Sequence, residues 1–380
     1  MDSHSTNTKL RRTAINGGFT IIAVMVTIIC VIPYVGVLAA AASGSFETLG
    51  LLAQTVLARY TMTTLILVAL VMTGSAVIGA GAAWLVTMTD FPGRRWLEIA
   101  LALPLAFPAY VLAYGYTHIL DHPGIVQSTL RDVTGWGPRD YWFPEIRSIG
   151  GAALMLTLVL YPYVYLLARA AFAAQGSSTF LAARVLGRSP FKAFLHVSLP
   201  MARPAIASGV MLVAMETIAD FGTVAYFGVQ TFAVGIYTSW FTMADRAAAA
   251  QLALGLLSFA LLLAMLERTS RGGAKYANGR RNAPMQRIKL GGTQRIMASA
   301  FCLTPVILGV LLPVIALSTM AIGSEQDLLS PRYLGFIKNS LMLASIAAVL
   351  AVIAALVLGT LHRVRANRWT GTSLYLTRIG

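Results

Sequence analysis

Long apolar runs separated by short polar segments dominate the pattern along the chain. Eight of these runs are long enough to cross a bilayer as helices, because one crossing takes about 20 residues. They lie near Gly17–Ala42, Met62–Val86, Ile99–Leu120, Ile149–Phe172, Ala205–Phe221, Ala247–Leu266, Ile296–Ile322 and Ser340–Leu361. Prolines inside the third and fourth runs predict bends there, because proline removes a helical hydrogen bond. The pattern predicts an all-α fold, a polytopic transmembrane bundle of about eight helices.

Composition supports a membrane protein and excludes an ordinary soluble domain. Apolar residues make up 57% of the chain and charged residues only 11%, and the mean hydropathy is +0.72. Basic residues precede the first run as they do in a signal peptide. That run is far longer than the roughly 7–15 apolar residues of a signal peptide, so an uncleaved first span is predicted. Both cysteines, Cys30 and Cys302, fall inside predicted spans and offer no metal-ligand spacing.

The net charge of +15 reflects membrane topology rather than a nucleic-acid site. Placing the N-terminus in the cytoplasm puts most of the 29 basic residues on the cytoplasmic side, including those of the segment Glu267–Arg295. The opposite orientation breaks the positive-inside rule at nearly every loop. The sequence therefore predicts a cytoplasmic N-terminus, the lipid bilayer as surroundings and no nucleic-acid partner.

Six spans, a basic segment and two further spans suggest a unit followed by a partial repeat. Residues 1–266 are interpreted as a first half, 267–295 as a cytoplasmic linker and 296–380 as an incomplete second half. The sequence entering span two, Tyr60–Leu65, is weakly similar to Phe336–Leu341 before span eight, and Arg-Trp follows both spans. The interpretation is a chain truncated in its second half, or one whose missing spans come from another chain.

The loop at 176–204 carries an ordered set of helix signals. Hydroxyl residues precede a short helix, and Gly187 suits the left-handed position that ends one. Ser189-Pro190 then predicts a new N-cap with proline in the first turn. Phe191, Phe194 and Leu195 are spaced to form one apolar face, and Leu199-Pro200 is expected to stop this second helix. The loop is thus predicted to present an apolar ridge to a partner.

The same loop resembles the coupling loop of binding-protein-dependent ABC importer permeases. The shared spacing is Ala182-Ala183, three residues, Gly187, nine residues and Val197-Ser198-Leu199-Pro200. Residues Gly187–Leu254 resemble, more specifically, the ferric-iron uptake permeases, and a weaker similarity covers the whole chain. The chain departs from the family pattern at Leu181, where the motif has Glu, and in its short second half.

The resemblance implies a function and a set of partners. The chain would be the inner-membrane permease subunit of a bacterial importer for iron(III), which a periplasmic binding protein delivers. The loop would enter a groove of an ATP-binding subunit, expected as a homodimer. ATP would be bound and hydrolysed by that partner, so the chain itself would be no enzyme, would carry no cofactor and has no phosphate-binding loop. The coupling residues would be Ala182, Ala183, Gly187, Phe191, Phe194, Leu199 and Pro200.

Two carboxylates lie in the fifth span, where ionised groups are costly. Glu216 and Asp220 are four residues apart and therefore share a helix face. Carboxylates suit a hard cation, and Tyr226 and Tyr237 follow as sources of phenolic oxygens. One hypothesis is that the four residues line the cation path and bind iron(III) transiently. The other is that the carboxylates are structural, as caps of broken helices or partners of basic residues.

Two rival functions stay open at the level of sequence. The cargo could instead be another substrate such as thiamine or phosphonate, because permeases for these share the coupling loop. The acidic character of the intramembrane charges favours a cation. The chain could also be a non-functional truncated fragment. An intramembrane enzyme is disfavoured, because no nucleophile–base or metal-ligand arrangement falls within the spans.

Overall fold

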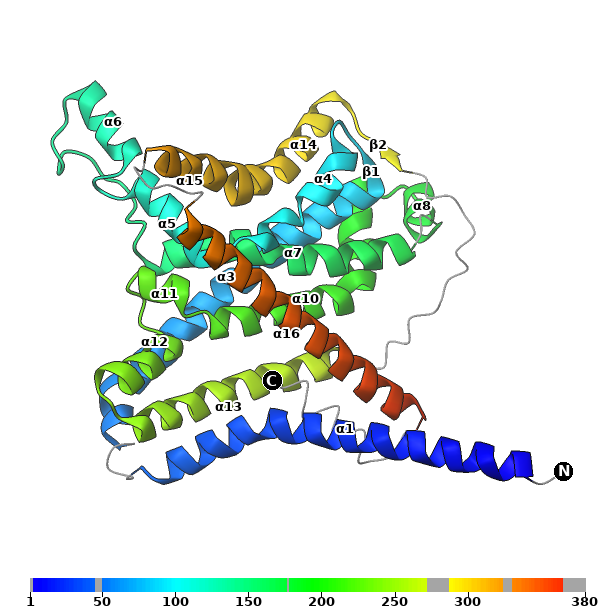
Figure 1. Cartoon of the computed structure of the whole chain (residues 1–380). Helices are drawn as coiled ribbons and strands as arrows, with labels where there is room; N and C mark the ends of the chain where they lie inside the picture. The colour runs from blue at the N-terminus through cyan, green and yellow to red at the C-terminus, as the bar shows by residue number, and fades with distance from the viewer. Residues whose placement is uncertain (1–2, 45–49, 176–177, 272–286, 324–329, 365–380) are drawn as a thin grey trace. The chain divides into compact units, whose positions relative to one another are not determined.

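The structure is a computed structural model of the chain that describes residues 3–44, 50–175, 178–271, 287–323 and 330–364 (Figure 1). It forms two compact units, residues 44–323 and residues 1–43 with 324–380, which are described separately. The first of these units contains the helices α3 (Ala58–Met88), α4 (Arg94–Ala100), α5 (Ala109–Leu120), α6 (Ile125–Thr134), α7 (Ile149–Gln175), α8 (Ser178–Val185), α9 (Pro190–Ala193), α10 (Leu199–Ala219), α11 (Gly222–Tyr226), α12 (Phe232–Tyr237), α13 (Arg246–Arg271), α14 (Gly292–Val306) and α15 (Leu312–Ile322).

The predicted fold class is confirmed. Among the described residues, seven helices are long and apolar enough to cross a membrane, and one sharply bent pair raises the number to eight. The bent pair is the predicted third span. It is broken by a 94° bend between Arg94–Ala106 and Ala109–Thr134. Pro108 stands at this break in an extended conformation and cannot continue the preceding helix. Pro162, by contrast, lies inside α7, which continues through it.

Small residues bring the central helices of the larger unit into close contact. Helices α3, α7 and α10 pack together there (Figure 1). Ser75, Gly79 and Ala83 are all buried and recur every four residues along α3, the spacing that lets membrane helices approach closely. A Cβ atom on Gly79 would stand 2.8 Å from the Tyr161 carbonyl oxygen of α7, and one on Gly209 would stand 2.7 Å from Val164 Cα. The backbones therefore touch through glycine.

Connections between the helices of this unit lie at two opposite ends (Figure 1). One end contains the C-terminal parts of α3 and α7 with α4 and α8, and these share one apolar cluster. The opposite end contains the α5–α7 connection, where Arg147 and Asp121 form an ion pair 2.8 Å long. At that end Arg59 also donates to Gln230 over 3.2 Å. These ends are called the coupling end and the distal end below.

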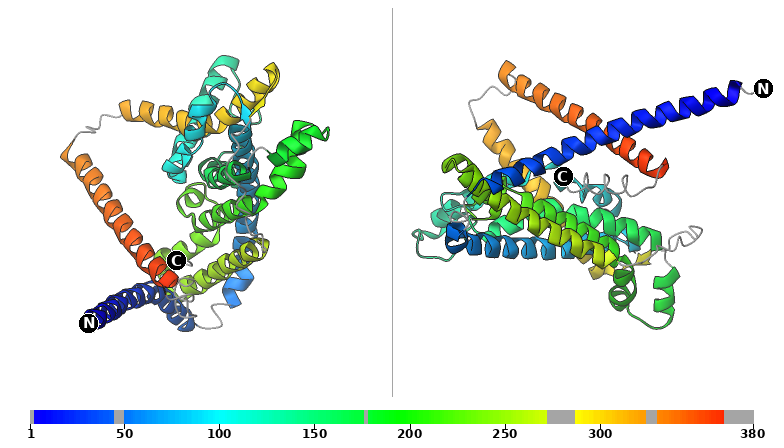
Figure 2. Two further views of the ribbon diagram at one scale, coloured as in Figure 1. Left: turned by 90° about the vertical axis from the view of Figure 1, so that its right-hand side faces the viewer. Right: turned by 90° about the horizontal axis from the view of Figure 1, so that it is seen from below.

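The segment after the predicted linker packs onto helices α3, α4 and α5 of the same unit. Strand β2 (Ile288–Lys289) pairs in parallel with β1 (Thr89–Asp90), which follows α3. Helices α14 and α15 then run along α4 and α5 (Figure 2). The Tyr116 hydroxyl donates to the Leu308 carbonyl oxygen over 2.8 Å, and Cys302 is fully buried in the core. The compact unit thus continues to residue 323, whereas the proposed halves divide at 267–295, of which 272–286 lie outside the described residues.

In its described residues the smaller unit contains two long helices, α1 (Ser3–Ala42) and α16 (Pro331–Val364). Val26 of α1 packs against Val357 and Leu358 of α16. Most apolar side chains described along both helices are exposed within the chain. These helices are therefore predicted to contact lipid or another polypeptide, because this unit alone leaves most of their apolar surface uncovered.

Candidate functional site

The coupling loop folds into the helix–break–helix arrangement that its sequence predicts. Helix α8 ends at Val185, and Gly187, two residues later, has a left-handed φ of +83°. The amide of Gly187 donates to the Arg184 carbonyl over 3.0 Å, and that of Arg188 donates to Ala183 over 3.1 Å. This is the Schellman pair of bonds, which satisfies carbonyls at a helix end and favours glycine at the left-handed position. Ser189 begins the next helix by accepting the Lys192 amide at Oγ over 3.3 Å.

The prediction that Leu199-Pro200 stops this second helix is wrong. Residues Phe191–Ala219 form one continuous helical segment that includes the fifth span. A wider π-helical turn at Phe194–Ser198 precedes the proline, and the Leu199 amide donates to the Phe194 carbonyl five residues earlier. The wider turn accommodates a proline that lacks an N–H and would crowd the preceding turn. The same device recurs at Leu312-Pro313, which follows a π-helical turn at Ile307–Leu311.

The apolar ridge of the coupling loop differs from the predicted one. Phe194 faces inward rather than outward, because its ring packs on Trp84 of α3 at a centroid distance of 4.7 Å. Phe191 and Leu195 are exposed, as predicted. Val185 and Leu186 complete the exposed set and are 87% and 84% accessible. We call Val185, Leu186, Phe191 and Leu195 the coupling ridge. The sequence-based prediction did not include Val185 and Leu186. In the structure, Phe180 and Ala183 on the opposite side of α8 are buried.

The remaining predicted coupling residues occupy three kinds of position. Ala183 is buried against the bundle, Leu199 is half-buried and Pro200 is exposed at the start of α10. Gly187 is exposed at the turn, where a Cβ atom would meet nothing within 4 Å. The side chains of Leu181 and Ala182 lie outside the described part of the structure, so the proposed interface role of Ala182 stays a prediction.

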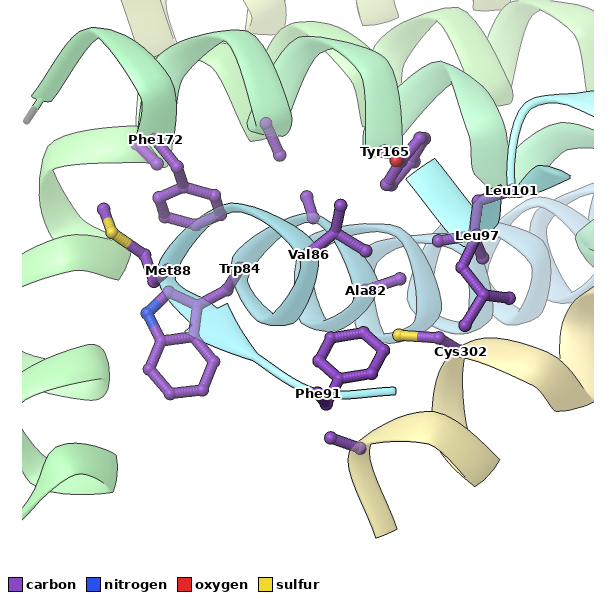
Figure 3. Packing of buried hydrophobic residues seen from close by; sticks show 14 of the residues in the cluster. Ala82, Trp84, Val86, Met88, Phe91, Leu97, Leu101, Tyr165, Phe172 and Cys302 are labelled. Atoms are coloured by element: carbon purple, nitrogen blue, oxygen red, sulfur yellow. The ribbon is translucent and has the colours of Figure 1, made fainter. Parts of the chain in front are cut away.

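An aromatic cluster connects the coupling loop to the spans. Trp84 contacts Phe194 and also Phe180 of α8, at a centroid distance of 6.4 Å. Phe172 of α7 lies 6.4 Å from Phe194, and Figure 3 shows its ring beside Trp84 and Met88. Both short helices of the loop are thereby packed on α3 and α7. Nothing in the sequence singles out Trp84, because the whole of span two is apolar.

A charged cluster ties α4 to α7 at the same end. Glu98 Oε1 accepts Arg169 Nη1 of α7 over 2.8 Å, and Glu98 Oε2 accepts Arg94 Nη1 over 3.4 Å. The Tyr165 hydroxyl donates to the Glu98 backbone carbonyl over 2.8 Å. One carboxylate placed between two guanidinium groups leaves the cluster with a net positive charge. The coupling end is therefore basic in its ordered core as well as in its loops.

The two carboxylates of the fifth span have different surroundings. Asp220 follows the end of α10 and accepts three bonds from α11: from the Thr223 amide at 3.1 Å, the Thr223 hydroxyl at 3.0 Å and the Val224 amide at 3.2 Å. It therefore caps a helix start, as the structural hypothesis states. Glu216 is exposed within the chain and lies close enough to Tyr163 of α7 for its carboxylate to interact with the phenol.

The two tyrosines do not join these carboxylates. The Tyr226 hydroxyl pairs with Thr117 Oγ1 of α5 over 2.8 Å, and its ring lies under the Arg147 guanidinium. Tyr237 stacks on Phe221 and Phe241, with ring centroids 4.5 Å and 4.8 Å away. Within the described residues no cluster of three or more His, Cys, Asp or Glu side chains forms a metal site. Residues Glu216, Asp220, Tyr226 and Tyr237 thus form no ready-made binding site in this conformation.

Comparison with known proteins decides the family. A family described as "Binding-protein-dependent transport system inner membrane component" matches residues 75–269, just over half of the chain. The chain belongs to this family. It is thus a multi-pass inner-membrane transport component, and the matched region extends from α3 through the coupling loop to α13.

Curated relatives in this family carry different names. The "Fe(3+)-transport system permease protein FbpB 2" of Haemophilus influenzae is 25% identical over 343 residues, 89% of this chain and 63% of the relative. The "Molybdenum transport system permease protein ModB" of Escherichia coli is 26% identical over 186 residues, 47% of this chain and 78% of the relative. The chain therefore spans less than two thirds of the length of the iron relative.

A solved structure confirms the fold. The bacterial ABC transporter for import of the acidic polysaccharide alginate has a chain that superposes with a TM-score of 0.58 at 16% identity. The superposition covers 71% of this chain and all of that one. At this identity the likeness concerns the helical architecture and not the cargo.

Proposed function

We propose that the chain is the permease subunit of an ATP-driven importer, coupled to an ATP-binding subunit through the coupling ridge. The observation that carries the proposal is the ordered loop at 178–199, whose two helices expose Val185, Leu186, Phe191 and Leu195 at one end of the bundle. Exposed apolar side chains on short helices suit insertion into a groove of a partner. Phe180 and Phe194 connect the loop to the spans, so a displacement of the loop would move α3 and α7.

The partners follow from the same proposal. An ATP-binding subunit, acting as a homodimer, would bind at the coupling end, which would be cytoplasmic. A periplasmic binding protein would deliver the cargo at the distal end. The superposed alginate importer has been solved with its "alginate pentasaccharide-bound periplasmic protein", which supports a partner of this kind. The N-terminus would lie in the cytoplasm, in agreement with the basic residues Lys9, Arg11 and Arg12 near the start of α1.

Iron(III) is the proposed cargo. The support is the iron-named relative, which matches 89% of the chain, together with the acidic, exposed side chain of Glu216 in the fifth span. Glu216 is a hard oxygen donor and suits a hard cation. A lipid-facing carboxylate would be costly, so Glu216 is proposed to face a water-filled path or a partner's surface.

An oxyanion or phosphonate is the second candidate cargo. The observation in its favour is that other curated relatives are named for molybdenum, for sulfate and for 2-aminoethylphosphonate, at 26–31% identity. Transport assays decide between the candidates. The full chain would be expressed with its ATP-binding and periplasmic partners in cells lacking their own importers. ATP-dependent accumulation of radiolabelled iron(III), but not of molybdate, sulfate or 2-aminoethylphosphonate, is expected. If only one of the anions accumulates, that anion replaces iron(III) as the proposed cargo. If none of the four compounds accumulates, the result contradicts the importer proposal.

Substitutions of the two carboxylates are expected to separate transport from stability. Glu216→Gln is expected to lower iron uptake by about tenfold or more while leaving thermal stability unchanged, because it removes only the exposed intramembrane charge. Asp220→Ala is expected to cost about 1–2 kcal/mol of stability, because the start of α11 loses its cap. Asp220→Asn, which retains an acceptor, serves as the matched control. Full uptake by Glu216→Gln in a stably folded protein would remove Glu216 from the path.

A further inference from the structure

A pocket at the distal end lies outside the coupling loop and outside the proposed path residues. Its volume is about 200 Å³. It opens between the end of α5, the residues just before α6, Arg147 two residues before α7, the end of α11 and Met320 of α15. Helices α5, α6, α11 and α15 lie at the left of Figure 1. The side chains that matter are Tyr114, Thr117, His118, Asp121, Arg147 and Tyr226.

Arg147 is held rigidly on one side of this pocket. Its Nε donates to Asp121 Oδ2 over 2.8 Å, and its Nη1 donates to the Tyr226 backbone carbonyl over 3.2 Å. The guanidinium carbon also lies 5.1 Å from the centre of the Tyr226 ring. The bond to Asp121 raises the pKa of Arg147 above its ordinary value, so the cation is permanent. Apart from the nearby Tyr226 side chain, which interacts with the guanidinium, its Nη2 has no hydrogen-bond partner among the described residues, and the Arg147 side chain is 42% exposed.

Two further side chains of the pocket keep a donor that the described residues do not use. The Thr117 hydroxyl donates its single proton to the Tyr114 carbonyl over 2.9 Å, so the Tyr226 hydroxyl must be the donor to Thr117 Oγ1. Each Asp121 oxygen accepts one hydrogen bond, Oδ2 from Arg147 and Oδ1 from the His122 amide at 2.8 Å. The Tyr114 hydroxyl and the His118 ring make no hydrogen bond to the described part of the chain, and both can donate.

From this arrangement we infer that the pocket binds a small anionic group, a carboxylate or a tetrahedral oxyanion, at Arg147 Nη2. A guanidinium edge matches the geometry of such groups, and Tyr114 and His118 stand on the same pocket wall as further donors. The volume of about 200 Å³ exceeds that of several water molecules and accommodates an ion of this size. Because Asp121 already neutralises much of the charge of Arg147, the site is weaker than a free arginine would make it.

Two sources offer this chemistry. One is a free anion in the external medium, and the other is an acidic side chain of the protein that docks at the distal end. The second source rests on the proposed function, because it needs a delivering partner. The chemistry of the site is the same in both cases, and neither depends on which cargo is transported.

Binding of radiolabelled sulfate to the purified full chain in lipid nanodiscs tests the inference. Arg147→Gln is expected to abolish saturable binding, and Arg139→Gln, an exposed arginine of the same loop that does not line the pocket, is expected to leave it unchanged. Asp121→Asn is expected to strengthen binding severalfold, because it removes the competing carboxylate while Arg147 remains. Melting curves of each variant identify any loss of folding.

A second measurement identifies the source. The affinity of the chain for its periplasmic partner is measured with and without sulfate. If sulfate binding depends on Arg147 but Arg147→Gln leaves the affinity for the partner unchanged, a free anion is the ligand of the pocket. Partner affinity that falls about tenfold in Arg147→Gln and is competed by sulfate supports the acidic side chain. If sulfate binds neither the natural chain nor Asp121→Asn, and Arg147→Gln leaves the partner's affinity unchanged, the inference is overturned. None of these measurements requires ATP-driven uptake. Failure of the anion-site inference can therefore be distinguished from failure of the proposed function.

Discussion

Gly79→Leu is expected to prevent the larger unit from folding. A Cβ atom at this position would stand 2.7 Å from Val164 Cβ, 2.8 Å from the Tyr161 carbonyl oxygen and 2.9 Å from the Tyr165 amide nitrogen. Two of these neighbours are backbone atoms of α7, so the helices must separate to admit any side chain. Overpacking of a close-packed core costs about 1–3 kcal/mol even where side chains yield, and here the backbone must move. We expect almost no monodisperse protein by size-exclusion chromatography after detergent extraction.

Gly36→Leu is the matched control for this experiment. Gly36 lies in α1, where a Cβ atom would meet nothing within 4 Å, so an added leucine disturbs no packing in its unit. Its yield and melting temperature are expected to equal those of the natural chain. Gly79→Ala is expected to fall between the two variants, with a clearly lowered melting temperature. A stable Gly79→Leu protein would show that α3 and α7 do not pack through this glycine.

Removing the coupling ridge is expected to abolish transport without loss of the fold. Leu186 and Phe191 are 84% and 66% exposed, so replacing both with serine removes little internal packing. If they enter a groove of the ATP-binding subunit, each would act as an interface anchor worth about 2 kcal/mol or more. Co-purification with that subunit is therefore expected to fall at least about tenfold, and ATP-driven uptake with it.

Val133→Ser controls for a general effect of losing exposed apolar surface. Val133 is 80% exposed on α6, at the distal end, so its replacement is expected to leave co-purification with the ATP-binding subunit unchanged. The double serine variant should also melt at the temperature of the natural chain. Undiminished co-purification of the double variant would contradict the proposed coupling surface.

Local hydrogen-bond chemistry was predictable from the sequence because its partners are neighbours in the chain. Gly187 adopts the left-handed conformation and Ser189 caps the following helix, as predicted. The break at Pro108 follows equally from the properties of proline. The exception is Pro200, where a π-helical turn absorbs the proline, and the helix continues. Whether a proline ends a helix or is accommodated depends on how the preceding turn is packed.

The direction of each side chain was much harder to predict. In a soluble helix the polar face marks the outside, but a membrane helix is apolar on its lipid-facing and protein-facing sides alike. Phe194 was therefore assigned to the exposed ridge, although it packs on Trp84, while exposed Val185 and Leu186 were missed. The two intramembrane carboxylates looked equivalent in the sequence. Only the structure shows that Asp220 caps α11 and that Glu216 stays exposed.

The sequence alone determined the helical membrane fold and, within the coupling loop, the helix break at Gly187 and the new helix start at Ser189. Each of these depends on long apolar runs or on contacts within a few residues. The tertiary structure decided which helices touch through glycine, how Trp84 connects the loop to the spans, and how Arg147 meets Asp121 and Tyr226. These contacts join residues tens of positions apart, and apolar spans carry no sequence signal that selects among their possible partners.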